Sequence, residues 1–313
     1  MGLKFILIGY YGFGNFGDEW LRQQSYRLLD SAFPNCQIIC LTNGPNTHTQ
    51  INRRSWCRLL YQIWKSNGVV FGGGGIFQNQ TSRRSPYFYG LIAALAWWCR
   101  RPVIAMGQSI GPLRGRMISS GVKWGLNRSA VLALRHASSW FPNALITADL
   151  AYYNATYQAW GKRDGDIAVC VRSRWLESHH IQAVETMGAS VGIICQPSQD
   201  VRHQNEVTLP DIPKTRLSVV VSMRYHACIW ASLLGIPFIA WGDDPKLKNI
   251  AQQCGQHWVG LDAPVDWDTL LAHVQQEWSR YQHALTMTVP RLIDSFSPLI
   301  LKLRQTLSDP IHT

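Results

Sequence analysis

The chain has 313 residues, 46% of them hydrophobic and 16% charged, and carries a formal net charge of +11. This length accommodates two domains of about 150 residues each, and the hydrophobic content argues against a disordered chain. No apolar run approaches the roughly 18 residues of a membrane-spanning helix. We expect Phe5–Ile8 to form a first strand and not part of a signal peptide.

The positive charge is concentrated in the first half of the chain. Residues 1–150 contain 16 Lys and Arg against four acids, whereas residues 151–313 contain 14 Lys and Arg against 15 acids. No Asp or Glu occurs between Asp30 and Asp149. Such a basic half can face an anionic membrane or an anionic substrate, or be a solvated surface without a partner. Nucleic acid is not expected, because no helix-turn-helix, RRM or zinc-finger pattern is present.

The eight cysteines are scattered and include no CxxC pair. Several lie in apolar segments, which is typical of reduced, buried cysteines in a cytoplasmic protein. We therefore expect neither a disulfide framework nor a metal site.

Strands and helices alternate along the first half of the chain. The hydrophobic pattern predicts strands at 4–8, 37–42, 68–71, 102–106, 131–134 and 145–148, and helices at 18–31, 52–65, 86–99 and 115–126. This alternation predicts a parallel sheet with right-handed crossovers.

The polar stretch Gly161–Asp166 separates a second series of elements from the first, so we expect domains at 1–160 and 161–313. The second series has predicted strands at 167–171, 191–195, 217–221 and 236–240, and predicted helices at 177–187, 226–234, 246–254, 266–283 and 289–307. The fold class is therefore α/β, with two Rossmann-like domains. We expect them to face each other across a cleft, as in GT-B-like enzymes, with the last helix packing back on the first domain.

Gly12, Gly14 and Gly17 follow the first strand and open a helix, which matches the dinucleotide-binding fingerprint in form. A nicotinamide site would also need an acid at the end of the second strand, and that region, Leu41–Gly44, has none. Two interpretations remain. The glycines form a tight turn, or they admit a sugar that Asn15, Asp18 and Glu19 contact.

A second glycine run, Gly72–Gly75, also follows a strand. Gly73 and Gly74 can offer backbone N–H groups to an anion, or the run can mark a close contact between domains. Arg83 and Arg84 then precede a helix that begins near Pro86. Two cations at a helix N-terminus oppose its dipole, and a phosphate or carboxylate bound between them would offset this; a solvated surface pair is the alternative interpretation.

The segment from Val219 to Lys246 is the most informative part of the chain. It is predicted to form a strand, a polar turn with Arg224 and His226, a helix, another strand and a loop with Lys246. Ligands of open α/β sheets bind at the carboxyl ends of the strands. Two cations and a titratable imidazole at that edge suit an anionic substrate that must receive a proton.

Six segments together resemble the polysaccharide pyruvyl transferase family. They are Gly9-Tyr-Tyr-Gly-Phe-Gly-Asn-Phe-Gly-Asp-Glu19, Phe71-Gly-Gly-Gly-Gly-Ile-Phe-Gln78, Thr81-Ser-Arg-Arg-Ser85, Gly107-Gln-Ser-Ile-Gly-Pro112, Ser222-Met-Arg-Tyr-His-Ala227 and Asp244-Pro-Lys246. Each motif is modest evidence by itself, but six in the family's order are strong evidence.

The resemblance implies transfer of pyruvate from phosphoenolpyruvate, as co-substrate, to a sugar of a cell-surface polysaccharide or of its lipid-linked precursor. It implies Arg84, Arg224 and Lys246 as donor-binding residues and His226 as the general acid, with no further cofactor. The sugar acceptor can be carried on a polyprenyl lipid, as in the family's cell-wall branch. We then expect a cytoplasmic protein, with peripheral contact to the anionic inner face of the membrane.

Two departures from the family stand out. Only about 20 residues separate Cys195 from Val219, where the family usually has more. The chain also reads Arg135-His136 where the family tends to have Arg-Asp. Two other functions are therefore kept: a GT-B glycosyltransferase using a nucleotide-sugar, and a non-catalytic sugar-binding relative.

Trp97 and Trp98 end an apolar helix beside Arg100 and Arg101. An aromatic pair next to cations suits a membrane interface, and it equally suits a buried helix with a basic tail.

Overall fold

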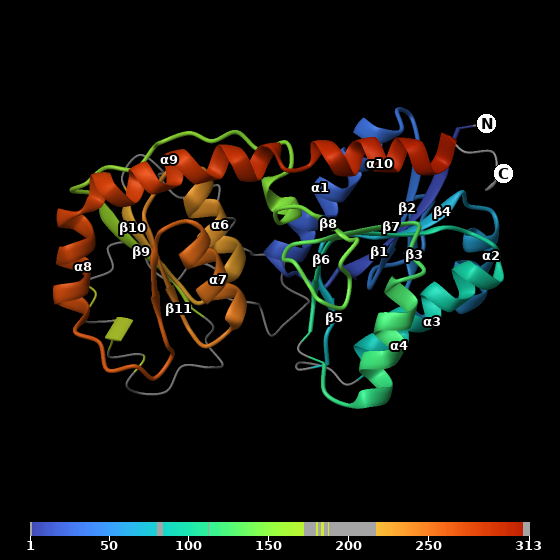
Figure 1. Ribbon diagram of the computed structural model, residues 1–313, viewed down its shortest axis with the longest axis horizontal. Coiled ribbons are helices and arrows are strands. Elements are labelled where there is room, and N and C mark those ends of the chain that lie inside the picture. Colours follow the sequence, from blue (N-terminus) through green and yellow to red (C-terminus); the bar gives the residue numbers. More distant parts are fainter. Residues whose placement is uncertain are drawn as a thin grey trace. The chain divides into compact units, whose positions relative to one another are not determined.

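The computed structural model describes residues 2–79, 84–111, 113–171, 180, 183–184, 187 and 217–308 (Figure 1). Contacts divide the chain into two compact units. Unit 1 contains Met1–Asn154 together with Asp294–Thr313, and unit 2 contains Ala155–Ile293.

Unit 1 is built around a parallel sheet with the strand order β3-β2-β1-β4-β6-β7-β8, and β5 pairs with β6. Its strands are β1 (Lys4–Tyr11), β2 (Gln37–Thr42), β3 (Gln50–Asn52), β4 (Gly68–Phe71), β5 (Gly74–Phe77), β6 (Val103–Ile110), β7 (Val131–Leu134) and β8 (Leu145–Ile146). The order changes direction between β1 and β4, which is the switch point where doubly wound sheets bind ligands.

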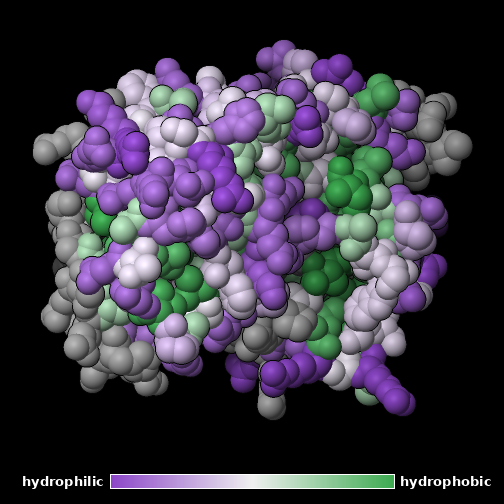
Figure 2. Space-filling view, turned by 60° about the vertical axis from the view of Figure 1, so that its left-hand side comes forward, coloured by the Kyte–Doolittle hydropathy of each residue, from purple (hydrophilic) through white to green (hydrophobic). Residues whose placement is uncertain are grey.

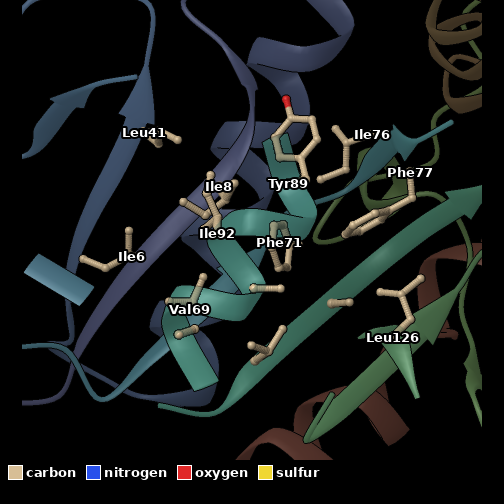
Figure 3. Close-up of a cluster of buried hydrophobic side chains, with 14 of the residues drawn as sticks. Ile6, Ile8, Leu41, Val69, Phe71, Ile76, Phe77, Tyr89, Ile92 and Leu126 are labelled. Carbon is tan, nitrogen blue, oxygen red and sulfur yellow. The ribbon is translucent and has the colours of Figure 1, made fainter. Parts of the chain in front are cut away.

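Three helices pack against one face of this sheet and bury the main core of unit 1. They are α2 (Trp56–Trp64), α3 (Ser85–Trp98) and α4 (Arg116–Leu126). Ile6 and Ile8 of β1 and Val69 and Phe71 of β4 lie in one buried cluster with side chains of these helices, among them Ile92 (Figure 3). Successive side chains of a strand point to opposite faces of the sheet, so Phe5 and Leu7, which are also buried, lie on the other face.

The opposite face of the sheet is covered by α1 (Phe16–Ala32), α10 (Ser297–Ser308) and a short 3₁₀ helix at Leu150–Tyr152. Arg304 of α10 donates to the carbonyls of Ser31 (2.8 Å) and Ala32 (3.3 Å) at the carboxyl end of α1. A cation there satisfies orphan carbonyls and complements the helix dipole. The expected return of the last helix to the first domain is confirmed (Figure 1).

Unit 2 contains a parallel sheet of order β12-β11-β10-β9. Its elements are β9 (Asp166–Cys170), β10 (Leu217–Ser222), α6 (Tyr225–Leu233), β11 (Phe238–Trp241), α7 (Pro245–Gln253), β12 (His257–Val259), α8 (Trp267–Gln276) and α9 (Trp278–Asp294). A buried cluster joins Val219 and Val221 of β10 to Trp241, Trp267 and Leu271. The α/β fold class with two parallel-sheet units is confirmed.

Several local predictions were wrong. The predicted helix 52–65 begins only at Trp56, because residues 50–52 pair with β2 as strand β3. The strand β12 was missed. The predicted helices 266–283 and 289–307 divide differently, since α8 ends at Gln276 and α9 continues to Asp294 with Pro290 inside it. The predicted strand 191–195 and most of the predicted helix 177–187 lie outside the described residues, as does the shortened segment before position 217.

No helix among the described residues is both long and apolar enough to cross a bilayer. The seven cysteines in the described part of the chain are all free. Figure 2 shows a face on which hydrophilic residues predominate and hydrophobic residues gather in separate patches.

Candidate functional site

The carboxyl edge of the unit 2 sheet brings together the residues predicted for chemistry in this unit. Arg224 and His226 follow the end of β10, and Lys246 follows the end of β11. The two strands are direct neighbours, with Ser222 paired to Ala240. Because parallel strands present their carboxyl ends at one edge, the three side chains originate from adjacent turns.

The turn after β10 is held by its own hydrogen bonds. The Ser222 hydroxyl accepts from the Arg224 N–H at 2.9 Å and lies 3.0 Å from the Arg224 carbonyl. The Met223 N–H donates to the Cys170 carbonyl at 2.8 Å, which ties the turn to β9. Arg224 is thereby fixed as the N-cap residue of α6, where no side chain caps the first turn.

His226 lies in the first turn of α6 and is half-buried, with its ring 5.3 Å from that of Tyr225. Two residues further on, Cys228 is fully buried, and burial raises the pKa of its thiol well above the usual range. Cys228 is therefore not a thiolate nucleophile at neutral pH. The imidazole of His226 is the group of this turn best suited to proton transfer.

Lys246 lies in the first turn of α7 and is half-buried. Asp244 caps this helix by accepting from the Lys246 N–H at 3.0 Å, and Pro245 occupies the following position. The preceding loop is anchored by Trp258, whose indole N–H donates to the Gly242 carbonyl at 2.9 Å. The backbone around Lys246 is thus held by the cap at Asp244 and by the hydrogen bond from Trp258 to Gly242.

In unit 1, the loop between β1 and α1 lies at the switch point of the sheet. Gly12 and Gly14 have φ of 79° and 71°, which favours glycine. Gly17 is a buried residue of α1, and its N–H donates to the Asn15 side chain, which caps the helix. The glycines therefore form the tight turn that was one of the two interpretations. The other, that this loop admits a sugar, stays a prediction.

Glu19 holds this loop from inside. Its carboxylate accepts from the Gly12 N–H at 2.6 Å and pairs with Arg22 at 2.8 Å. Burial raises the pKa of the Tyr11 and Tyr89 hydroxyls, and the charge of Asp18, in the same turn as Glu19, adds to this rise. The contact of Asp18 and Glu19 with an acceptor sugar stays a prediction.

The second glycine run is explained mainly by close packing within unit 1. A Cβ on Gly72 would lie 2.2 Å from the Tyr11 hydroxyl, and a Cβ on Gly73 would lie 2.8 Å from Leu150. Gly74 has φ of 134° and already belongs to β5, which pairs with β6. The predicted loop is therefore shorter than expected, because half of the run is a strand.

Two residues that the sequence analysis did not single out shape this region. Tyr11 is buried against Gly9 and Gly72. Gln108, also fully buried, donates to the Gly72 carbonyl and, at 3.3 Å, to the Phe71 carbonyl. The sequence identified the motif around Gln108 only through the family resemblance. The role of Gln108 could not be predicted, because a single buried amide that supports a neighbouring loop does not change the hydrophobic periodicity of its strand.

A buried ion pair lies near the same edge of the sheet. Arg135 and Asp149 approach to 2.6 Å, with 3% and 0% of their side chains exposed. Arg135 also donates to the Gly107 carbonyl at 3.0 Å, and Asp149 caps the 3₁₀ helix by accepting from Ala151 at 2.9 Å. Arg135 thus has a carboxylate partner even though His136 follows it in the sequence.

Arg84 is exposed and is the N-cap residue of α3 in unit 1, where no side chain caps the helix. Arg83 lies outside the described residues. Within the described ranges, no group of three or more His, Cys, Asp or Glu side chains could hold a metal ion.

Sequence and structure comparisons place these features in context. Residues 15–186 match the family model for polysaccharide pyruvyl transferase. No curated protein sequence matches the chain.

Solved structures with the same fold share little sequence with the chain. A putative UDP-N-acetylglucosamine 2-epimerase from Listeria monocytogenes has a TM-score of 0.61 at 8% identity, covering 100% of this chain and 99% of its own. The UDP-GlcNAc 2-epimerase from Neisseria meningitidis, bound to UDP-GlcNAc, has a TM-score of 0.56 at 8% identity, covering 97% and 100%. HepE of Anabaena in complex with UDP has a TM-score of 0.52 at 8% identity, covering 98% of both chains. These likenesses show a GT-B-like fold.

Proposed function

Since the chain belongs to the polysaccharide pyruvyl transferase family, we propose that it transfers pyruvate from phosphoenolpyruvate to two hydroxyls of one sugar. The product is a cyclic ketal, and phosphate is released. The acceptor in this proposal is a sugar of a cell-surface polysaccharide or of its precursor on a polyprenyl lipid.

The observation that supports this proposal most is the placement of Arg224, His226 and Lys246 after adjacent strands β10 and β11. Phosphoenolpyruvate carries a phosphate and a carboxylate, and two cations can neutralise both groups in a partly water-excluded turn. Arg suits bidentate contact with either group, while Lys acts as a point charge.

The proposed reaction begins with proton transfer. The His226 imidazolium donates a proton to the methylene carbon of phosphoenolpyruvate, which becomes a methyl group and leaves positive charge at the adjacent carbon. One sugar hydroxyl adds to that carbon, and its proton returns to His226. The bond between this carbon and the phosphate oxygen breaks, the second hydroxyl forms the second C–O bond, and its proton leaves with the phosphate.

In this scheme the phosphate and carboxylate of bound phosphoenolpyruvate favour the imidazolium form of His226, because opposite charges stabilise the protonated ring. All donor contacts in the proposal are side-chain cations, so it includes neither metal nor cofactor.

Arg84 as a third donor-binding cation, and Asn15, Asp18 and Glu19 as acceptor contacts, are further parts of the proposal. Arg84 is exposed at the start of α3, and the three acceptor residues lie where the unit 1 sheet changes direction. We propose a cytoplasmic protein that meets its lipid-linked acceptor at the inner membrane face.

A GT-B glycosyltransferase is the alternative, because proteins of the same fold have been captured with UDP or UDP-GlcNAc. A non-catalytic sugar-binding relative is a second alternative, suggested by the short segment before Val219.

Phosphate release from phosphoenolpyruvate, measured with soluble β-linked ManNAc, galactose and glucose acceptors, tests the proposal. Release that needs an acceptor and is lost in Arg84→Ala supports pyruvyl transfer. Absence of release with every acceptor, together with thermal protection by a nucleotide-sugar, would favour the glycosyltransferase. Protection by an acceptor alone would favour the non-catalytic relative.

A further inference from the structure

The outward side of α3 in unit 1 is apolar and exposed. Between Pro86 and Trp98 this helix contains no charged residue. Its exposed side chains include Tyr87 (63% exposed), Leu91 (49%) and Trp98 (73%), which follow one another at helical spacing. A helix that is apolar on all sides is normally buried, so this exposed stripe calls for a partner.

Both neighbouring helices also expose large apolar side chains. Tyr61 and Trp64 of α2 are 53% and 56% exposed, and Met117 and Trp124 of α4 are 88% and 56% exposed. The three helices pack on the same face of the sheet, and α3 contacts the other two. The rings of Trp97 and Trp124 meet edge to face, with centroids 5.3 Å apart. We call this surface the α2–α4 face.

Cations accompany the aromatic rings on the α2–α4 face. The Arg128 guanidinium lies 4.2 Å from the ring centre of Trp124, and the Lys65 ammonium lies 5.7 Å from that of Trp64. Arg101 donates to the Trp64 carbonyl at 2.7 Å, which places another cation between α2 and α3. Residues 31–148 contain 13 Lys and Arg and no Asp or Glu, so no carboxylate from these helices offsets the charge.

We propose that the α2–α4 face docks on the surface of an anionic lipid bilayer. Trp and Tyr favour the interface between lipid headgroups and acyl chains, aliphatic side chains enter the acyl boundary, and Lys and Arg pair with headgroup phosphates. A second copy of this chain fits less well, because two such cationic faces would repel each other. Single-stranded nucleic acid would use the aromatic rings and cations but leaves Leu91 and Met117 without a role.

This inference does not depend on the proposed reaction. If the acceptor is lipid-linked, docking would hold the protein at the membrane that carries it. The α3 helix begins directly after Arg84, so the face starts beside a residue proposed to bind the donor.

Co-sedimentation of the full chain with vesicles tests the docking. Wild type is expected to sediment with phosphatidylcholine vesicles containing 30% phosphatidylglycerol at low salt, and far less with pure phosphatidylcholine or at high salt. Lys65→Gln with Arg128→Gln should weaken binding by about fivefold for each cation removed. Trp64→Ser with Trp98→Ser should weaken it at least tenfold.

A matched control pair lies on the opposite side of unit 1. Leu301 of α10 is 59% exposed, and Lys302 beside it is also exposed, so Leu301→Ser with Lys302→Gln removes one apolar side chain and one cation elsewhere. The control should bind vesicles as wild type does. Circular dichroism melts should show that all variants remain folded.

Three results would overturn the proposal: no binding of wild type to anionic vesicles at low salt, equal loss of binding in the control pair, or retained binding in both α2–α4 variants. Sedimentation equilibrium without lipid identifies a second copy as the occupant if wild type dimerises and Trp98→Ser does not. Binding of labelled oligonucleotides in preference to vesicles would assign the face to nucleic acid.

Phosphate release with soluble acceptors should be unchanged in the surface variants, so a failure of docking is separable from a failure of the proposed reaction.

Discussion

Arg84 and Arg224 occupy the same position on two different helices: each is the N-cap residue of its helix, α3 and α6, and neither helix has a side-chain cap at its start. By contrast, α1, α7 and α8 are capped by the side chains of Asn15, Asp244 and Asp266. A cation at a helix N-terminus is opposed by the helix dipole. An anionic ligand at each arginine would relieve this opposition.

Replacing Arg224 with Ser should therefore weaken binding of the donor phosphoenolpyruvate without lowering the stability of the fold. The backbone of Arg224 is extended (φ −109°, ψ 118°), which suits a capping side chain, and we expect the unfolding free energy to stay constant or rise by up to about 1 kcal/mol. The KM for phosphoenolpyruvate should rise about 10-fold or more, since a hydrogen bond to a charged group contributes about 1.5–3 kcal/mol. Urea unfolding and steady-state kinetics measure both quantities. A loss of stability that accompanies the loss of affinity would assign Arg224 a structural role.

His226→Ala should reduce kcat by about 10²–10⁴-fold, which is the usual contribution of a general acid. The variant should still bind phosphoenolpyruvate, because the proposed donor contacts of Arg224 and Lys246 remain. His283→Ala, which changes an exposed histidine of α9, serves as the control and should keep wild-type turnover. Turnover within a few-fold of wild type in His226→Ala would rule out this residue as the acid.

Gly73→Ala should destabilise unit 1 by about 1–3 kcal/mol, because the new methyl group would lie 2.8 Å from Leu150. Gly90→Ala is the matched control. No atom lies within 4 Å of its added Cβ, and alanine favours the helix by about 1 kcal/mol. Chemical unfolding should thus give opposite signs for the two substitutions. If the run at Gly73 were open to a ligand and not packed, Gly73→Ala would keep wild-type stability.

Asp149→Asn should lower the unfolding free energy by about 3–5 kcal/mol, because it removes the charge that compensates the buried Arg135 guanidinium. Arg135→Met with Asp149→Leu should cost less than Asp149→Asn alone, since no uncompensated charge remains. Glu277→Gln breaks the exposed pair with Arg280 and should change stability by less than about 1 kcal/mol. A double variant as unstable as the single one would contradict this explanation.

Acidification should lower the unfolding free energy through His257, the first residue of β12. The Nε2 atom of His257 lies 2.6 Å from the Tyr281 hydroxyl, and burial, with His273 and Arg280 nearby, lowers the pKa of His257 below 6.5. Below that value the unfolded chain binds more protons than the folded one, so the unfolding free energy decreases as the pH falls. Urea unfolding of wild type and His257→Gln at about pH 7.5 and about pH 5.5 should show a smaller decrease in the variant. Equal decreases would exclude His257 as the source.

Local sequence signals located the elements that carry the candidate residues. The β-branched run before Ser222 and the Gly235 and Pro237 signals bracketed β10 and α6, and the structure bears out both elements. We predicted that Arg224 and Lys246 lie at the same edge of the sheet, because parallel strands end at one edge. The strands that precede them, β10 and β11, are neighbours in the sheet. Where the local signal was weak, the prediction was wrong: residues 50–52 form a short segment with a single apolar residue, Ile51, and only pairing with β2 makes this segment a strand.

The sequence by itself determined the alternation of strands and helices, the concentration of cations in the first half, and the family motifs, because each depends on residues close together in the chain. Only the tertiary structure decided that Gly72 admits the Tyr11 hydroxyl, that Asp149 compensates Arg135, and that Trp98 faces outward. These relationships join residues far apart in the sequence or depend on which helix face the sheet covers. Periodicity indicates that a face is apolar, but burial depends on what packs against it.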